Sequence, residues 1–319
     1  MIAPLPGTSL DTATVLDGLA DKARAYAEGA RADNTRRAYE SDLRAFCSWC
    51  QTRGLTCLPA TAETLSLYIA DVGESMKPAT LQRRLTAIAV AHKAAGYESP
   101  TAHEVVRSVL TGVRRKLGVA QVQKLALAVD DVRAIVDELG DDKPIDVRDR
   151  ALLLLGFAGA LRRSELVALD VADVAFEKQG VVIVLHRSKT NQEGDIERIA
   201  VPYGSDYRTC PVRALQAWIE VVGDGPLFRS IDRHGNLGNR LSAHSVALVV
   251  KARAEQAGLD PALVAGHSLR SGFATSAARA GKSEAAIMRQ TRHKSVTVAR
   301  RYIRQGTMWD DHAGHGIGL

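Results

Sequence analysis

The chain of 319 residues lacks the features that mark secreted, membrane and metal-dependent proteins. Its start, Met1 to Pro6, has no basic segment followed by an apolar run, and no later stretch is long and apolar enough to span a bilayer. It has no internal repeat, no low-complexity segment, no cluster of metal ligands and no carboxylate pair of the two-metal nuclease kind. We therefore expect a cytoplasmic protein that needs no membrane, no metal and no cofactor.

Cysteine is also scarce, with four residues in the whole chain. Cys47 and Cys50 lie in a predicted helix with Trp49 between them, and no second pair is nearby to complete a zinc site. We expect both to be reduced thiols in a core, as is usual in a reducing compartment.

Acidic residues are nearly missing from the end of the chain. Between His267 and Arg304 nine lysines and arginines face the single acid Glu284, a local charge of +8 where the whole chain carries +6. The same stretch holds His293 and Tyr302. A tyrosine is a weak nucleophile at its free pKa of about 10, so an attacking tyrosine needs cations around it and around the anion that it attacks. The segment suits phosphodiester chemistry on nucleic acid.

Each of these residues also has an ordinary interpretation, because a helical tyrosine is usually a core residue and an arginine is usually solvated. The spacing favours the functional one. Arg270 follows His267 by 3 residues, and Tyr302 follows His293 by 9. This order resembles the C-terminal motif of the tyrosine recombinases, the phage integrase family that includes Cre-type and Xer-type enzymes.

A second motif lies upstream, where Ala160–Leu166 resembles the family's G-L-R-x-S-E-L. It follows the apolar run Ala151–Phe157, which predicts a buried helix. The resemblance implies that Arg162 grips the scissile phosphate and that Glu165 orients the site. Arg163 has the alternative of a solvated charge at a helix end.

A β-hairpin is predicted next. Val181–His186 is rich in β-branched residues, Asn191–Gly194 is a turn and Ile196–Val201 returns, which places Lys189 near the tip. A lysine at such a tip is ordinarily solvated. The resemblance implies instead that Lys189 is the general acid for the departing 5′-oxygen of DNA.

The family's reaction is then implied for this chain. Tyr302 attacks the phosphate with His267 as general base, while Arg162, Arg270 and His293 donate hydrogen bonds to its oxygens. The product is a 3′-phosphotyrosyl bond, from which strands are exchanged through a Holliday junction without ATP. The catalytic set is Arg162, Glu165, Lys189, His267, Arg270, His293 and Tyr302.

Two positions depart from the family's pattern. Thr291-Arg292-His293 replaces the Leu-Gly-His that is commoner in the family, so Arg292 stands in place of a glycine. Ala160 stands where glycine usually precedes Leu161. Because histidine is the family's majority choice at 293, where some Cre-like members have tryptophan, we expect its role to hold. We expect the absent glycine to affect the local turn.

The implied fold is mainly α with a small β-sheet or hairpin, arranged as a two-domain DNA clamp. We expect an N-terminal tail (1–20), a helical core-binding SAM-like domain (21–116), a linker (117–127) and a catalytic domain with a C-terminal tail (128–319). Helices are predicted from Asn34 or Thr35, from Thr61 and from about Ala79, and Asp130 is predicted to cap the first catalytic helix. Arg114–Lys116 is predicted to start the exposed basic linker.

Cations of the first domain are candidate DNA contacts, with solvation as the alternative for each. Arg83 is the candidate for a base contact in the major groove, helped by Thr80 and Lys77. Arg36 and Arg37 are candidates for phosphate contacts, and Arg115 lies where the chain would cross DNA.

The resemblance also implies partners. They are double-stranded DNA with an inverted-repeat site, bound by a dimer, and a homotetramer that joins two such sites in the bacterial cytoplasm. Met308 and Trp309 lie in a C-terminal tail, and the resemblance implies that this tail docks on a neighbouring protomer. The alternative is that the tail packs on its own subunit. The need for accessory proteins stays open, as does the choice among phage or plasmid recombinase, integrase and chromosome-dimer resolvase.

Three functions fit the motifs: a site-specific recombinase, a related enzyme that relaxes or reseals DNA, and a DNA-binding regulator without chemistry. The complete catalytic set favours the first, because a regulator has no use for Tyr302 beside His293.

Overall fold

The computed structural model describes residues 33–117, 124–186, 196–293 and 295–308, together with Leu19, Lys22 and Gly314. The chain forms two compact units, residues 1–121 and 122–319, which are described separately. Lys189 lies outside the described residues, as does most of the tail after Met308. Within the described part, no helix is long and apolar enough to cross a membrane, and no group of three or more His, Cys, Asp or Glu residues is placed to hold a metal.

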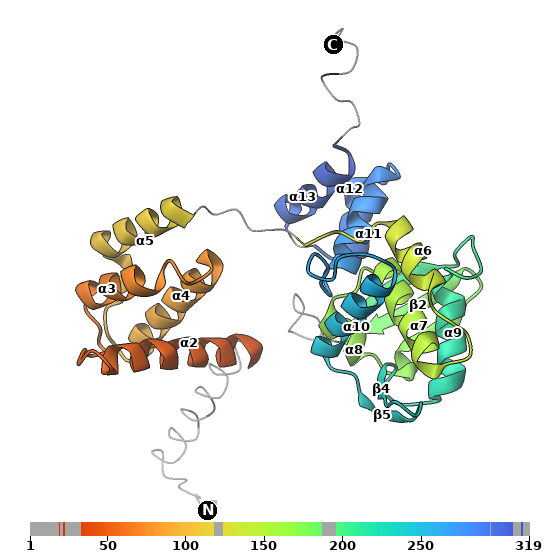
Figure 1. Cartoon of the computed structure of the whole chain (residues 1–319), viewed down its shortest axis with the longest axis horizontal. Helices are drawn as coiled ribbons and strands as arrows, with labels where there is room; N and C mark the ends of the chain where they lie inside the picture. Colours follow the sequence, from red (N-terminus) through yellow and green to blue (C-terminus); the bar gives the residue numbers. More distant parts are fainter. Residues whose placement is uncertain are drawn as a thin grey trace, which may run out of the picture. The chain divides into compact units, whose positions relative to one another are not determined.

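The first unit is helical (Figure 1). Its elements are α2 (Asp33–Gln51), α3 (Ala62–Val72), α4 (Pro78–Ala94), the 3₁₀ turn η1 (Pro100–Ala102) and α5 (Glu104–Leu117). Helix α2 packs on α4, and α3 packs on α5. The predicted helix starts are confirmed to within a residue or two, and Thr61 caps α3 by accepting a hydrogen bond from the backbone N–H of Thr64 at 3.1 Å.

The core of this unit comes from the predicted apolar positions. Phe46, Leu65 and Ile69 are fully buried, and on α4 the same holds for Ile88. Arg114–Lys116 forms the last turn of α5 and is not part of a linker, which corrects the sequence interpretation. The apolar positions Val109, Leu110 and Val113 hold this turn on the core, which explains why α5 continues to Leu117.

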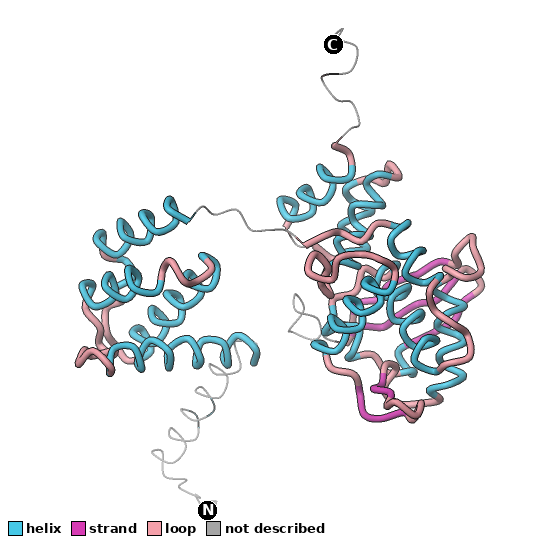
Figure 2. The backbone as a smooth tube through the Cα atoms, viewed as in Figure 1, coloured by secondary structure: helices cyan, strands magenta, loops and turns pink. Residues whose placement is uncertain are grey.

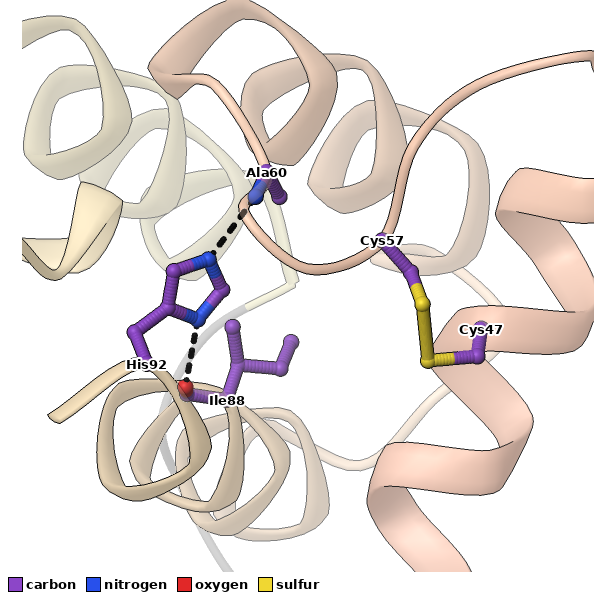
Figure 3. Close-up of a disulfide and its surroundings, with 5 residues drawn as sticks. All are labelled: Cys47, Cys57, Ala60, Ile88 and His92. Atoms are coloured by element: carbon purple, nitrogen blue, oxygen red, sulfur yellow. Dashed lines mark hydrogen bonds between the residues drawn. A yellow bond between two sulfur atoms is a disulfide. The ribbon is translucent and has the colours of Figure 1, made fainter. Parts of the chain in front are cut away.

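A cross-link fastens the loop between α2 and α3 (Figure 3). Cys47 forms a disulfide with Cys57, so the expectation of a reduced Cys47 is wrong, while Cys50 is a buried free thiol. The loop folds back on α2 and brings the two Cα atoms to 5.0 Å, within the usual range for a disulfide. Buried His92 holds the other side of the loop, because its Nε2 accepts from Ala60 N–H at 2.8 Å.

In the residues that the structure describes, the second unit combines helices with two small antiparallel sheets (Figure 2). Its first half consists of α6 (Val129–Asp137), α7 (Pro144–Ala158), α8 (Arg163–Ala168), the 3₁₀ turn η2 (Val171–Asp173), β1 (Val174–Glu177), β2 (Gly180–Leu185), β3 (Glu197–Pro202) and α9 (Pro211–Val222). Its second half consists of β4 (Arg229–Ile231), β5 (Leu237–Arg240), α10 (Ala243–Gln256), α11 (Ser268–Arg279), α12 (Glu284–Thr291) and α13 (Val296–Gly306).

The predicted hairpin is confirmed as β2 and β3, which pair antiparallel with Ile183 opposite Ile199. Val181, Ile183 and Leu185 alternate along β2 toward the core. Strand β1 pairs with the other edge of β2 and was not predicted. The chain thus enters and leaves the segment that carries Lys189 on two paired strands.

Helix α7 is the buried helix that the apolar run predicts, with Leu152, Leu153 and Leu155 fully inaccessible. Helix α11 packs on α7 and α13. It approaches the chain before α6 so closely that a Cβ at Gly272 would overlap the carbonyl of Leu127, and this approach fixes the helix that carries Arg270.

The first helix of this unit starts differently from the prediction. Ala128 is the N-cap of α6, and Asp130 lies in the first turn. The carboxylate that accepts the Ala128 N–H, at 2.7 Å, belongs to Asp131. The acidic residue at the third helical position does the capping, so the assignment of Asp130 as the cap is corrected.

Candidate active site

Tyr302 lies between the two predicted histidines. The Nε2 atom of His267, which directly precedes α11, is 3.1 Å from the Tyr302 hydroxyl. The ring of His293, which follows α12, stacks on the tyrosine ring at 5.7 Å between centroids and 18° between planes. Three segments that are separate in sequence therefore bring a phenol hydroxyl and two imidazole rings together, with one imidazole nitrogen at hydrogen-bond distance from the hydroxyl.

Helix α13 holds Tyr302 in place through its apolar face. Ala299 is buried, and Tyr302 and Ile303 pack on a small cluster formed by Ala274, Ala278 and Ile287 of α11 and α12. On the exposed face, Arg300 pairs with Glu284 at 2.8 Å. The amphipathic pattern of α13 thus selects which face reaches the site.

Thr291 fixes the tautomer of His293. Its hydroxyl donates to the carbonyl of Ile287 at 2.7 Å and lies 2.8 Å from His293 Nδ1. Because a hydroxyl has a single hydrogen, Nδ1–H is the donor to Thr291. Burial, with Arg270, Arg162, His267 and Arg292 nearby, lowers the pKa of His293 to about 4. The neutral imidazole therefore carries its free lone pair on Nε2.

Three arginines surround one carboxylate beside this group. Arg162 donates to Glu165 through Nη1 and through its backbone N–H, the latter at 2.8 Å from Oε2. Arg292 Nη2 donates to the same Oε2 at 2.6 Å. Arg270 is 1% exposed and donates to the carbonyls of Ala160 and Thr291. The site is a buried cationic cluster in which Glu165 offsets part of the charge.

The electrostatics follow from this crowding. Burial, reinforced by Arg162 and Arg292, lowers the pKa of Arg270 to about 9, so its guanidinium stays charged at neutral pH. For Glu165, burial raises the pKa, but Arg292 and Arg162 outweigh it and the pKa lies below its ordinary value. The Nε atom of Arg270 is buried without a hydrogen-bond partner among the described residues. An anion that reached this atom would gain a charged hydrogen bond.

The two positions that lack the family's glycine both have left-handed backbone. Ala160 has φ 46° and Arg292 has φ 54°. Each residue therefore bears the strain of this conformation, about 1–2 kcal/mol.

The remaining predicted residues are Lys189 and the candidate DNA contacts of the first unit, which is described by itself. Lys189 is outside the described residues, between the ends of β2 and β3. In the first unit, Lys77 is exposed at the N-cap of α4 and Thr80 is half-buried in its first turn. Arg36 and Arg37 are exposed at the start of α2, and Arg115 is exposed near the end of α5.

The guanidinium of Arg83 is already engaged by a buried carboxylate. It bonds buried Asp42 through Nε at 2.7 Å and Nη2 at 3.1 Å, with its side chain 49% exposed. Asp42 raises the pKa of Arg83 by this hydrogen bond and its charge. A base contact by Arg83 would use the donors that Asp42 leaves.

Sequence reasoning missed two residues of the cluster, Thr291 and Arg292. Thr291 is fully buried and bonds His293, and Arg292 bonds Glu165. A non-glycine residue in a turn that the family builds with glycine was the available signal for Arg292.

Comparison with known proteins shows the family to which this chain belongs. Residues 125–307 match the model of the phage integrase family, and residues 25–98 match that of the phage integrase N-terminal SAM-like domain. An integrase/recombinase XerD homolog of Selenomonas ruminantium is 44% identical over 298 residues, which cover 92% of this chain and 87% of that protein.

Solved structures share the fold at low identity. A lambda integrase (75–356) dimer bound to a COC′ core site has a TM-score of 0.63 and 18% identity, with 92% of this chain and 97% of that one covered. The XerH site-specific recombinase bound to a palindromic difH substrate has a TM-score of 0.55 and 17% identity, with 78% and 68% covered. The motifs, the fold and the relative at 44% identity agree, and the chain belongs to the phage integrase family of tyrosine recombinases.

Proposed function

We propose that Tyr302 is the nucleophile with which this recombinase cleaves and rejoins DNA at specific sites. The observation that carries the proposal is the 3.1 Å approach of His267 Nε2 to the Tyr302 hydroxyl, beside a buried cluster of arginines. The tyrosine oxygen forms a bond to the scissile phosphorus as the bond to the 5′-oxygen breaks. The tyrosine proton passes to His267.

Arg162, Arg270 and His293 stabilise the charge that builds on the phosphate oxygens. Arg162 is 15% exposed and holds Glu165 through one guanidinium nitrogen, which leaves other donors for the substrate. Arg270 has a buried Nε without a partner among the described residues, but it is covered in the DNA-free protein. Contact between Arg270 and a phosphate therefore requires the side chains over it to shift. Loss of one such donor typically costs about 100-fold to 1000-fold in rate.

Lys189 protonates the departing 5′-oxygen. The support for this role is the family's motif and the pairing of β2 with β3, which carry the segment between them. The cleaved strand then holds a 3′-phosphotyrosyl bond and a free 5′-hydroxyl. The 5′-hydroxyl of the partner strand attacks this bond, releases Tyr302 and exchanges the strands through a Holliday junction without an external energy source.

The DNA partner is a short site with inverted repeats, bound by a dimer, and two sites meet in a homotetramer. The lambda integrase dimer on its core site and the XerH complex with a palindromic substrate support the dimer and the inverted repeats, while the tetramer rests on the resemblance to the family. In the first unit, Arg83, Thr80 and Lys77 contact bases, while Arg36, Arg37 and Arg115 contact phosphates.

Covalent capture tests the proposal. Purified protein is mixed with sheared DNA from its source and quenched with SDS, and the DNA linked to wild type or to Tyr302→Phe is sequenced. We expect one inverted-repeat sequence to be enriched by wild type alone. Equal capture by Tyr302→Phe would move the nucleophile elsewhere, and no capture by either would favour a binding protein without chemistry.

A further inference from the structure

Arg292 has a conformation that a glycine would adopt without strain. It caps the C-terminus of α12 with φ 54° and ψ 41°, and for an arginine this costs about 1–2 kcal/mol. Its side chain is 9% exposed although it is charged, and burial lowers the pKa of its guanidinium. Strain and burial of a charge are both unfavourable, so the contacts of this side chain must offset them.

These contacts join the segments that carry the catalytic residues. Nη2 donates to Glu165 of α8 at 2.6 Å, and Nη1 donates to the carbonyl of Gln290 in α12 at 2.9 Å. Weaker bonds of 3.3 Å reach the carbonyls of Gly159 and Ala160, after α7. Nε lies 3.7 Å from Glu197, the first residue of β3.

The backbone of Arg292 also takes part. Its carbonyl oxygen accepts a hydrogen bond from Arg162 Nη2 at 3.4 Å. Residue 292 therefore contacts Arg162 directly through its carbonyl and indirectly through Glu165. The next residue is His293, whose ring stacks on Tyr302.

We propose that Arg292 is a positioning residue for strand cleavage, which occupies Glu165 Oε2 so that Arg162 keeps donors free for the scissile phosphate. This inference rests on the proposed function. Glu165 Oε1 bonds the Arg162 guanidinium, whereas Oε2 bonds the Arg162 backbone and Arg292. A carboxylate divided in this way cannot form a two-oxygen fork with the Arg162 guanidinium.

Removing the Arg292 side chain changes this balance. Glu165 Oε2 then keeps only the Arg162 backbone N–H and can accept a second hydrogen bond from the Arg162 guanidinium, which turns from the substrate toward its own carboxylate. Since a misplacement of about 1 Å at a reacting centre can cost about 100-fold in rate, we expect a loss of that order in cleavage. DNA affinity, which many phosphate contacts share, changes little.

The test compares Arg292→Gly with wild type in single-turnover formation of the Tyr302–DNA adduct at saturating DNA. Glycine suits the left-handed turn, so this variant removes the side chain without adding backbone strain. Arg289→Ala is the matched control, because it removes an exposed arginine from the same helix. We expect adduct formation to be about 100-fold slower in Arg292→Gly and unchanged in Arg289→Ala, with similar DNA affinity in all three.

A double-mutant cycle separates positioning from a general structural role. In a Glu165→Gln background the carboxylate that Arg292 restrains is absent, so Arg292→Gly should slow adduct formation far less than it does in wild type. The same fold loss in both backgrounds would show that Arg292 does not act through Glu165 and would overturn the inference. Arg292→Lys, which keeps the charge without the planar fork, should fall between wild type and Arg292→Gly.

Failure of the inference and failure of the proposed function give different results. An Arg292→Gly protein that forms the adduct at the wild-type rate contradicts the inference alone. A wild-type protein that forms no adduct through Tyr302 contradicts the proposed function and the inference with it. If Arg292→Gly melts below the assay temperature, Arg292→Lys serves as the test. Adduct formation by Arg292→Lys at the wild-type rate would contradict the need for the planar guanidinium of Arg292.

Discussion

The donor role proposed for His293 must operate in a residue with a low pKa. Its Nδ1–H is committed to Thr291, so Nε2 donates to a phosphate only when the ring is protonated. Burial and the neighbouring arginines oppose that proton and lower the pKa to about 4. A bound phosphate has the opposite charge and raises the pKa again.

DNA binding is therefore expected to take up a proton at His293 at pH values above its DNA-free pKa of about 4. Calorimetric titrations in buffers of different ionisation enthalpy measure this uptake. His293→Gln should abolish it, and substitution of the exposed His244 on α10 should not. Equal uptake by wild type and His293→Gln would contradict a protonated His293 on DNA.

The DNA-free protein has the linked stability change. With a pKa of about 4 in the folded state and about 6.5 in the unfolded state, the unfolded chain binds more protons between these values. The free energy of unfolding of the second unit thus falls as the pH drops from about 6.5 to about 4. His293→Gln should show a shallower fall in a denaturant series.

Lys189 is tested by its leaving group. Lys189→Ala should slow cleavage of an ordinary 5′-oxygen substrate, because an alkoxide is a poor leaving group without a proton. A 5′-thiol leaving group needs little protonation and should restore the rate. A variant that stays equally slow on the 5′-thiol substrate has lost something other than a general acid.

At the scale of elements, local patterns predicted what local physics determines. The apolar run Ala151–Phe157 became buried α7, the β-branched run became β2, and Thr61 capped α3. The missed features depend on contacts between distant segments. Strand β1 pairs only once β2 is present, and Arg292 acquires its role from Glu165, which lies far away in sequence.

The disulfide was missed for the same reason, because the distance between Cys47 and Cys57 depends on how the loop folds back on α2. Cross-linking Cys47 to Cys57 restricts the unfolded loop, for which the chain-entropy model gives about 2–3 kcal/mol. Cys47→Ser should lose that much stability of the first unit under oxidising conditions. Under reducing conditions wild type and Cys47→Ser should have the same free energy of unfolding. If Cys47→Ser is as stable as oxidised wild type, the disulfide contributes nothing to stability.

At the scale of the whole molecule, DNA affinity should reflect two kinds of contact. Phosphate contacts make the logarithm of affinity fall with the logarithm of salt concentration, by about 0.9 per phosphate. Arg37→Ala should weaken binding to all sequences alike and reduce this slope by about one. Arg83→Ala should cost about 1–3 kcal/mol on the preferred base pair and relax the choice there.

Titrations over a salt series, with the preferred site and a site altered at one base pair, distinguish the two. Asp42 holds Arg83 by two hydrogen bonds, so in the proposed base contact the guanidinium is already oriented. If Arg83→Ala loses the same affinity for both sites, Arg83 contacts the DNA phosphate backbone and not a base.

The central claim is that Tyr302 becomes linked to a 3′-phosphate of DNA. The most direct measurement is mass spectrometry of the trapped adduct after digestion with nuclease and trypsin. We predict that the peptide Tyr302–Arg304 carries a nucleotide joined to the tyrosine oxygen through the 3′-phosphate of that nucleotide. The released strand should end in a 5′-hydroxyl. A nucleotide on any other residue, or attachment through a 5′-phosphate, would contradict the account.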